Sequence, residues 1–299
     1  MKKIILFLAI CSALTNIGCN KDEFLDQPIN GRQQLDDFFS SPESAESFVN
    51  SIYVKVNGES WWQVNMPRQI NEMATDDNWS GNTLQPRPDI TGIAAYNVFP
   101  GSTYFNSFWE SHYIGITRTN ISLERIPNVE IDEELKTRLL AETHFLRAFF
   151  YFDLVRSFGG VPIVTTYTEL LEPAINTRAT VDEVYELIED DLKKAVAGLP
   201  LRSEYASKDL GRATKGAAQS LLAKMYLTRE RWSEAQTMAN NVITSGEYSL
   251  EPNFANIYSV DNPYGVESIF EIGYINNQLF SEIGGQFSIT NGSRGDQGW

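Results

Sequence analysis

The chain has 299 residues, of which 42% are hydrophobic and 21% are charged, a composition typical of a globular protein. Acidic side chains outnumber basic ones by 39 to 24, which gives a formal net charge of −15. This charge disfavours nucleic acid and anionic lipid headgroups as partners, so we expect contact with a membrane only through a lipid anchor.

The N-terminus has the pattern of an export signal. Lys2 and Lys3 form a basic start, and residues 4–14 form an apolar segment that is too short to span a bilayer as a helix. Cys19 follows this segment at the position where such a signal is cleaved. We therefore predict a lipoprotein signal peptide over residues 1–18.

Cys19 is the predicted lipidation site, and residues 19–40 are the predicted tether. The chain has two cysteines, and removal of the signal peptide would remove Cys11, so Cys19 would have no disulfide partner. Acyl chains anchor a soluble body firmly, because each buried methylene contributes about 0.8 kcal/mol. The triplet Lys21–Glu23 resembles the short signal that directs Bacteroidetes lipoproteins to the outer face of the outer membrane. The alternative is an unmodified thiol in a tail.

Apolar residues recur at helical spacing in most of the chain after residue 41. A capping box at Thr180 and Glu183 marks one helix start, and the Gly159–Pro162 stretch marks one helix end. Prolines and glycines over residues 57–101 predict a long loop region, and short β-rich pieces are expected beyond Tyr248. The sequence predicts a mostly α fold with minor β, with helices over residues 42–56, 104–126, 132–158, 180–199, 214–228 and 232–245.

The last two predicted helices carry the spacing of a tetratricopeptide unit. Small residues stand where two helices must approach closely, and an aromatic residue fills the gap beside them. Such a unit cannot bury its apolar face alone, so neighbouring helices must stack on it. The residues that fit the spacing are Leu222, Ala223, Tyr226, Ala235, Ala239 and Val242.

Three long stretches, residues 141–164, 211–235 and 267–274, resemble the characteristic motifs of SusD/RagB-type outer-membrane lipoproteins. The stretch 116–126 agrees in order and spacing. The resemblance implies a tetratricopeptide-like helical scaffold with an irregular glycan-binding face, which faces the cell exterior. It also implies a partner, a SusC-like TonB-dependent transporter that receives oligosaccharide or polysaccharide from the lipoprotein.

The resemblance also bears on domain organisation. We expect one SusD-like helical domain over residues 41–299. Family members continue well beyond this length, and residues 292–299, "GSRGDQGW", look like the start of a further family motif. The chain is therefore expected to be the N-terminal portion of such a protein, truncated at its C-terminus.

Aromatic and polar residues in the predicted loop region are the candidates for binding the glycan. Sugar rings stack on flat apolar side chains, and nearby polar groups bind their hydroxyls. The alternative is that these rings pack the loops onto the helical core. By contrast, Trp109 and Trp232 lie on helical stripes and are expected in the core. The predicted ligand-binding residues are Trp61, Trp62, Asp76, Asp77, Asn78, Trp79 and Tyr96.

Two further function classes stay open. A glycoside hydrolase needs two carboxylates that flank the scissile bond, and Glu72 with Asp76 or Asp77 could supply them. A protein-interaction scaffold of tetratricopeptide type would use its repeats to bind peptide, without sugar. His112 and His144 both fall inside predicted helices, and no catalytic or metal-binding pattern surrounds them. We expect a binding protein and not an enzyme, with neither cofactor nor metal.

Overall fold

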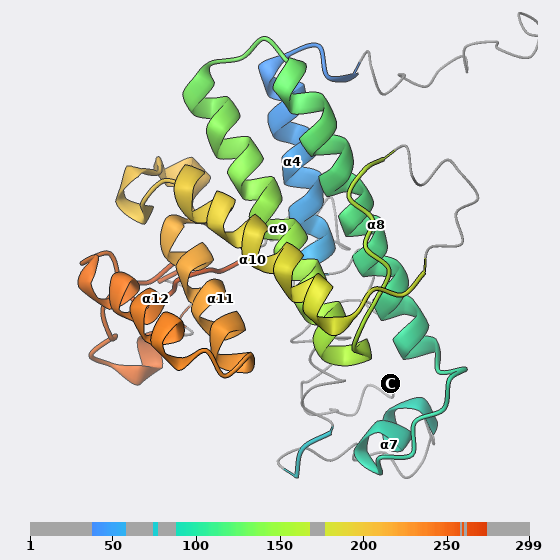
Figure 1. Cartoon of the computed structure of the whole chain (residues 1–299). Helices are drawn as coiled ribbons and strands as arrows, with labels where there is room; N and C mark the ends of the chain where they lie inside the picture. The colour runs from blue at the N-terminus through green and yellow to red at the C-terminus, as the bar shows by residue number, and fades with distance from the viewer. Residues whose placement is uncertain are drawn as a thin grey trace, which may run out of the picture.

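The chain folds into α-helices joined by turns (Figure 1). The computed structural model describes residues 38–57, 74–76, 88–167, 177–257, 259 and 262–273. The helices are α4 (Pro42–Asn57), α7 (Pro88–Ala94), α8 (Thr103–Arg125), α9 (Glu133–Phe158), α10 (Val181–Gly198), α11 (Lys215–Thr228) and α12 (Trp232–Thr244). Short 3-10 turns lie at Ile126–Asn128, Arg202–Glu204, Ser207–Asp209 and Phe254–Asn256. The predicted mostly α fold is confirmed.

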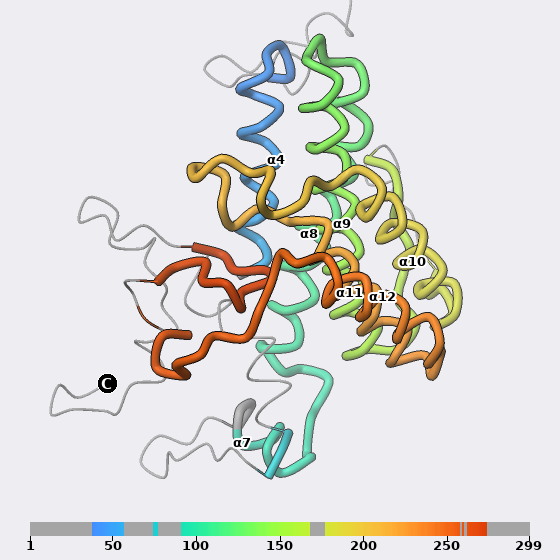
Figure 2. Tube along the Cα trace, turned by 90° about the vertical axis from the view of Figure 1, so that its left-hand side faces the viewer, coloured from blue at the N-terminus to red at the C-terminus, as the bar shows by residue number. Residues whose placement is uncertain are grey.

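Helix α9 is the centre of the molecule. It packs against α4 and α8 on one side and against α10 on the other (Figures 1 and 2). Phe150 and Tyr151 of this helix are fully buried, as a helix covered on most of its surface requires. A Cβ atom at Gly115 of α8 would lie 2.6 Å from the Phe150 ring, so glycine allows the close approach of α8 and α9.

Local capping fixes where the central helices begin and end. Asp132 Oδ1 accepts a hydrogen bond from Glu134 N at 2.9 Å at the start of α9. The predicted capping box of α10 is confirmed, because Glu183 N donates to Thr180 Oγ1 at 3.2 Å and Thr180 N donates to Glu183 Oε2 at 2.7 Å. Gly159 ends α9 with a φ of 72°, the left-handed region that glycine adopts readily.

Helices α11 and α12 form the hairpin that the tetratricopeptide spacing predicts, and α10 packs on α11. Leu222, Tyr226, Ala235 and Val242 are buried in it, whereas Ala239 is exposed. The last helix therefore buries only one narrow stripe.

Trp232 was expected in the core, and that expectation is wrong, because the residue is 61% exposed. It is the first residue of α12, and the residues of this helix that are buried are Ala235 and Val242 instead. Trp109 agrees with the prediction, since its partly buried ring packs against Tyr113 and Phe158 with centroids 4.9 and 5.1 Å away.

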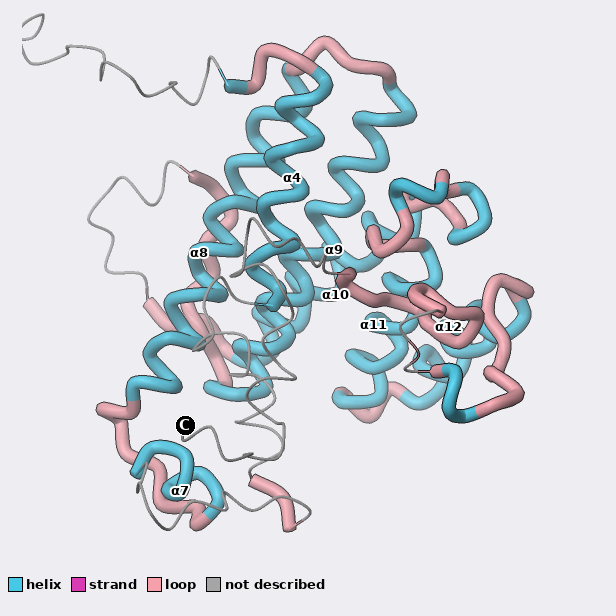
Figure 3. Tube along the Cα trace, turned by 180° about the vertical axis from the view of Figure 1, so that it is seen from behind, coloured by secondary structure: helices cyan, strands magenta, loops and turns pink. Residues whose placement is uncertain are grey.

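The region after α12 departs from the prediction of short β segments. Within the described residues that follow Tyr248, the backbone forms a 3-10 turn, bends and turns, and no strand is drawn there (Figure 3). Phe270 packs its ring on Phe145 of α9, with centroids 5.1 Å apart. Ile269 and Phe270 of this stretch thus pack against the helical core instead of pairing in a sheet.

Among the described helices, none has the length and apolar character needed to cross a membrane.

Candidate functional site

Helix α7 ends in an unusual way, with a tyrosine in the left-handed conformation. Tyr96 N donates to Ile93 O at 3.1 Å and Asn97 N donates to Gly92 O at 2.8 Å, which is the hydrogen-bond pattern of a Schellman motif. The position that Tyr96 occupies is normally glycine, because a side chain with positive φ is strained. The φ of Tyr96 is 54°. Strained residues of this kind cluster at functional sites.

The backbone turn holds the Tyr96 side chain out of the core. The residue is 78% exposed, and its hydroxyl donates a hydrogen bond to the backbone carbonyl of Ala74. That bond brings the segment Ala74–Asp76 beside the end of α7, although more than twenty residues separate them in sequence. Asp76 is exposed on this segment. The structure thus joins two of the predicted ligand-binding residues, Tyr96 and Asp76, at one place.

Further apolar groups lie next to Tyr96 and are also exposed. Val98 is 49% and Phe99 is 44% exposed, and Asn97, between Tyr96 and Val98, is exposed as well. We call residues 74–76 and 96–99 the Tyr96 surface; it lies beyond the N-terminal end of α8, away from the helical body (Figure 2). Its exposed aromatic rings can stack on sugar rings, and its carboxylate and amide can bind hydroxyls.

Cys19, Trp61, Trp62, Asp77, Asn78 and Trp79 lie outside the described residues. Sequence reasoning did not single out Phe99, although one signal pointed to it. Residues 90–109 carry no Asp, Glu, Lys or Arg, and Phe99 there precedes Pro100 and Gly101, which predict a surface loop.

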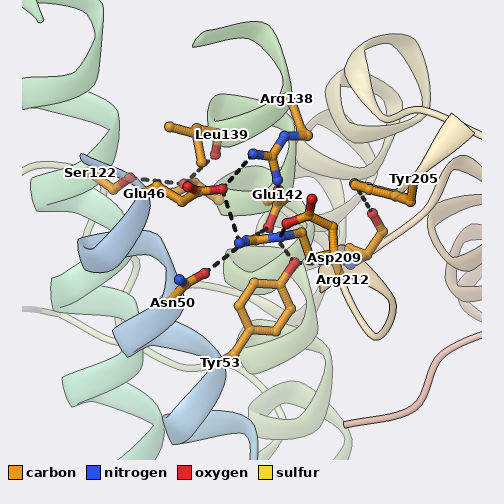
Figure 4. Close-up of polar contacts among 12 residues, drawn as sticks. Glu46, Asn50, Tyr53, Ser122, Arg138, Leu139, Glu142, Tyr205, Asp209 and Arg212 are labelled. Atoms are coloured by element: carbon orange, nitrogen blue, oxygen red, sulfur yellow. Dashed lines mark hydrogen bonds and ion pairs between the residues drawn. The ribbon is translucent and has the colours of Figure 1, made fainter. Parts of the chain in front are cut away.

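A second cluster of charged side chains joins α4, α9 and the turn before α11 (Figure 4). Arg138 binds Glu46 at 2.7 Å and Glu142 at 2.8 Å, and Arg212 binds the same two carboxylates at 3.0 and 3.3 Å. Tyr53 donates from its hydroxyl to Glu142 Oε2 at 2.7 Å. We call these five residues the Glu142 network.

The Glu142 network has the chemistry of a structural cluster. Burial raises the pKa of Glu142, and the positive charges of Arg212 and Arg138 act in the opposite direction. Burial also raises the pKa of Tyr53 far above its ordinary value, so its hydroxyl stays a donor. Both oxygens of Glu142 are engaged by these partners. A paired-carboxylate mechanism needs groups that face a substrate, which Glu142 does not offer.

The two histidines have structural contacts within the helices, as predicted. His112 packs on Phe108 with ring centroids 4.0 Å apart, and one of its ring nitrogens lies 2.8 Å from the Phe108 carbonyl oxygen. His144 lies 2.7 Å from Asp191, a fully buried carboxylate that also binds Arg147 at 2.8 Å. Over the described ranges, His, Cys, Asp and Glu side chains form no group that could hold a metal ion.

A small pocket lies between the turn before α11 and residues 264–271. Arg202, Tyr205, Arg212 and Tyr264 contribute to its wall. It has about 20 Å³ of space, which is enough for about one water molecule. The pocket is therefore too small for a sugar ring, and the Tyr96 surface remains the better candidate.

Comparison with known proteins identifies relatives over most of the chain. A SusD-like family model, described as "Starch-binding associating with outer membrane", matches residues 23–227. SusD-like protein P25 of Formosa agariphila is 26% identical over 271 residues, which are 89% of this chain and 50% of the relative. A SusD-like protein of Bacteroides ovatus is 24% identical over 313 residues, covering 98% of this chain and 55% of the relative.

Solved structures of similar fold agree with this match. A SusD-like protein of Bacteroides fragilis superposes with a TM-score of 0.72 at 28% identity, covering 88% of this chain and 49% of that one. A structure described as a laminarin binding SusD-like protein superposes with a TM-score of 0.73 at 29% identity, covering 79% of this chain and 52% of that one. The chain spans about half the length of the relatives that it matches.

Proposed function

Because the chain belongs to the SusD-like family, whose model is described as starch-binding and associating with the outer membrane, we propose that it is a surface glycan-binding lipoprotein. It captures an oligosaccharide or polysaccharide without transforming it. The observation that carries this proposal is the Tyr96 ring, 78% exposed on a backbone in a strained conformation. The laminarin-binding relative supports a glycan as the ligand.

The proposal includes an anchor and a partner. Cys19 carries the lipid that holds the protein at the outer face of the outer membrane, and a SusC-like TonB-dependent transporter receives the glycan. A Cys19→Ala variant should lose metabolic labelling with a fatty-acid analogue and move from the membrane fraction to the soluble fraction. Retention of the fatty-acid label by the variant would contradict the lipid site.

The proposed glycan contacts are stacking and hydroxyl binding at the Tyr96 surface. Tyr96 and Phe99 offer rings of moderate to high exposure, and the exposed Asp76 carboxylate accepts hydrogen bonds from hydroxyls. The hydrogen bond to Ala74 holds the Tyr96 ring in place, which lowers the ordering cost of binding. Trp61, Trp62, Asp77, Asn78 and Trp79 stay predicted contributors to the same function.

The test is glycan binding by the purified protein, measured by affinity electrophoresis in starch and in laminarin and by calorimetry with their oligosaccharides. We expect Tyr96→Gly to weaken binding at least about tenfold, because truncation of a central aromatic contact costs about 2 kcal/mol. Glycine suits the backbone position of Tyr96, so the variant should unfold at about the wild-type temperature. Trp79→Ala, measured in parallel, tests the predicted contribution of Trp79.

Trp232→Ala is the matched control. Trp232 is 61% exposed on α12, so the variant removes an exposed ring of another surface. It should bind glycan as the wild type does. If folded wild-type protein binds no glycan, the proposed function is wrong; if Tyr96→Gly and Trp232→Ala bind equally well, the site is misplaced.

One observation favours the alternative of a protein-interaction scaffold. Trp232 and Ile243 are 61% and 73% exposed on α12, and their spacing of eleven residues places them on the same side of the helix. Exposed apolar side chains of this kind occur at protein interfaces. Absence of glycan binding together with a folded protein would favour this alternative.

A further inference from the structure

The charges around the Tyr96 surface carry an inference about the class of glycan, which rests on the proposed function. We propose that this surface selects uncharged sugars and rejects glycans that carry carboxylate or sulfate groups. The described stretches 74–76 and 88–117 contain no Lys or Arg. Their acidic residues are Asp76, Asp89 and Glu110.

Recognition of an anionic sugar requires positive partners. Proteins bind carboxylates and sulfates through charge-assisted hydrogen bonds, most often from arginine. The described residues of the Tyr96 surface offer aromatic rings, an amide and a carboxylate, and they include no positive side chain for such an anion. The exposed Asp76 would also repel it directly, while the same carboxylate accepts hydrogen bonds from neutral hydroxyls.

Most Lys and Arg residues elsewhere in the described part of the chain contact other groups of the protein. Lys55, on α4, is only 3% exposed. The remaining described Lys and Arg residues begin at Arg118, whose guanidinium donates to the Ser51 carbonyl at 2.7 Å. Other cations that form ion pairs with carboxylates are Lys136, Arg138, Arg147, Lys193, Lys194, Arg212, Arg229 and Arg231.

The net charge acts in the same direction over a longer range. At a formal −15 the protein repels polyanions, and salt screens this repulsion beyond about 8 to 10 Å at physiological ionic strength. The general repulsion should therefore depend strongly on salt. A neutral glycan is not repelled by the net charge of the protein, so its binding should depend on salt only weakly.

The experiment compares chemically matched ligands that differ in charge. Starch is paired with carboxymethyl starch, and laminarin with sulfated laminarin, each at 20 and 200 mM NaCl. We expect the charged form to bind at least about tenfold more weakly at low salt, with a smaller difference at high salt. Binding of the neutral form should change less than about twofold between the two salt concentrations.

Two charge variants assign the selectivity to the Tyr96 surface. Asp76→Lys places a cation there, and Glu186→Lys makes the same change of charge at an exposed position of α10. Asp76→Lys should reduce the ratio of the affinity for neutral ligands to the affinity for charged ligands. The reduction should be several-fold larger than the one that Glu186→Lys causes. Equal reduction by both variants would overturn the assignment to this surface.

The experiment gives different results when the charge selectivity is wrong and when the proposed glycan binding is wrong. If the wild type binds the charged ligands as tightly as the neutral ones, the selectivity is wrong, while glycan binding stands. If folded wild-type protein binds none of the four polysaccharides, glycan binding itself is wrong, and the inference about charge falls with it.

Discussion

Tyr96 is a residue whose importance follows from its backbone conformation. In the sequence it is one tyrosine in a region rich in proline and glycine. In the structure it occupies a helix-ending position with a φ of 54°, and it is 78% exposed. Glycine is the common residue there, so the sequence around Tyr96 carries no signal for a Schellman motif. The same residue is now the centre of the proposed site.

Glu189 is a second residue whose environment decides its behaviour. Tyr226 donates to its carboxylate at 2.9 Å, Lys193 lies at 2.7 Å and Arg231 at 2.5 Å. Burial alone would raise the pKa of Glu189, but these hydrogen bonds outweigh burial and lower the pKa to about 2 from 4.5. The carboxylate therefore stays charged in the folded protein at pH values where it is protonated in the unfolded chain.

The pKa of Glu189 predicts how stability depends on pH. A lowered carboxyl pKa stabilises the fold above pH 4.5, and that contribution is lost as the pH falls from about 4.5 to about 2. Glu189→Gln should therefore be less stable than the wild type at pH 7. The difference in the free energy of unfolding should shrink across this window, as measured by urea unfolding at several pH values.

Glu186→Gln is the control for this measurement. Glu186 lies on the same helix and is exposed. Its replacement removes one carboxylate of the same helix and leaves the contacts of Glu189 in place. A difference between wild type and Glu189→Gln that stays constant from pH 7 to pH 2 would contradict the assigned shift.

At the scale of elements, the described helices other than α7 were predictable to within about two residues because their signals are local; α7 lies in the predicted loop region and was missed. Apolar spacing, the capping box at Thr180 and Gly159 lie within each segment. The exposure of Trp232 was not predictable in this way, because it depends on which stripe of α12 faces α11. The buried residues of α12 are Ala235 and Val242, and the tryptophan lies outside this set.

In the segment after α12, local sequence signals predicted an element that the structure does not form. The stretch 268–273, "SIFEIG", has β-forming residues and was expected as a strand, but the described backbone there forms bends and loop. A strand needs a partner strand to complete its hydrogen bonds. Packing of Phe270 against Phe145 of α9 buries the apolar side chain without one.

At the scale of the whole molecule, the Glu142 network joins segments far apart in the sequence. Arg212 and Glu46, which are 166 residues apart, lie 3.0 Å apart between guanidinium nitrogen and carboxylate oxygen. Asn50 Oδ1 accepts a further hydrogen bond from Arg212 at 2.8 Å. This cluster ties α4 and α9 to the turn that leads into the α11–α12 hairpin (Figure 4).

Removal of one member should therefore destabilise the whole molecule. Arg212→Met leaves the buried Glu142 carboxylate with one of its two cationic partners. Loss of one partner from a buried ion pair costs about 3 to 5 kcal/mol, and Arg138 remains to offset part of that cost. We expect a loss of about 2 to 4 kcal/mol in the free energy of unfolding, measured in urea.

Lys194→Met provides the matched surface control. Lys194 pairs with Asp190 at 2.7 Å on α10, and both side chains are more than half exposed. Exposed pairs contribute about 0 to 1 kcal/mol, so this variant should unfold close to the wild-type urea midpoint. Equal effects of the two variants would show that the Glu142 network contributes no more than a surface pair.

The sequence by itself determined the helical elements other than α7, the tetratricopeptide spacing and the family resemblance. These features follow from patterns among residues that are close in sequence, so local propensity and apolar periodicity are enough to predict them. The tertiary structure alone decided that the segment 74–76 lies beside Tyr96, that Trp232 is exposed and that Arg138 and Arg212 share two carboxylates. Each of these features depends on contacts between segments that are distant in sequence or on a single backbone torsion. Such contacts and torsions produce no periodic pattern in the sequence.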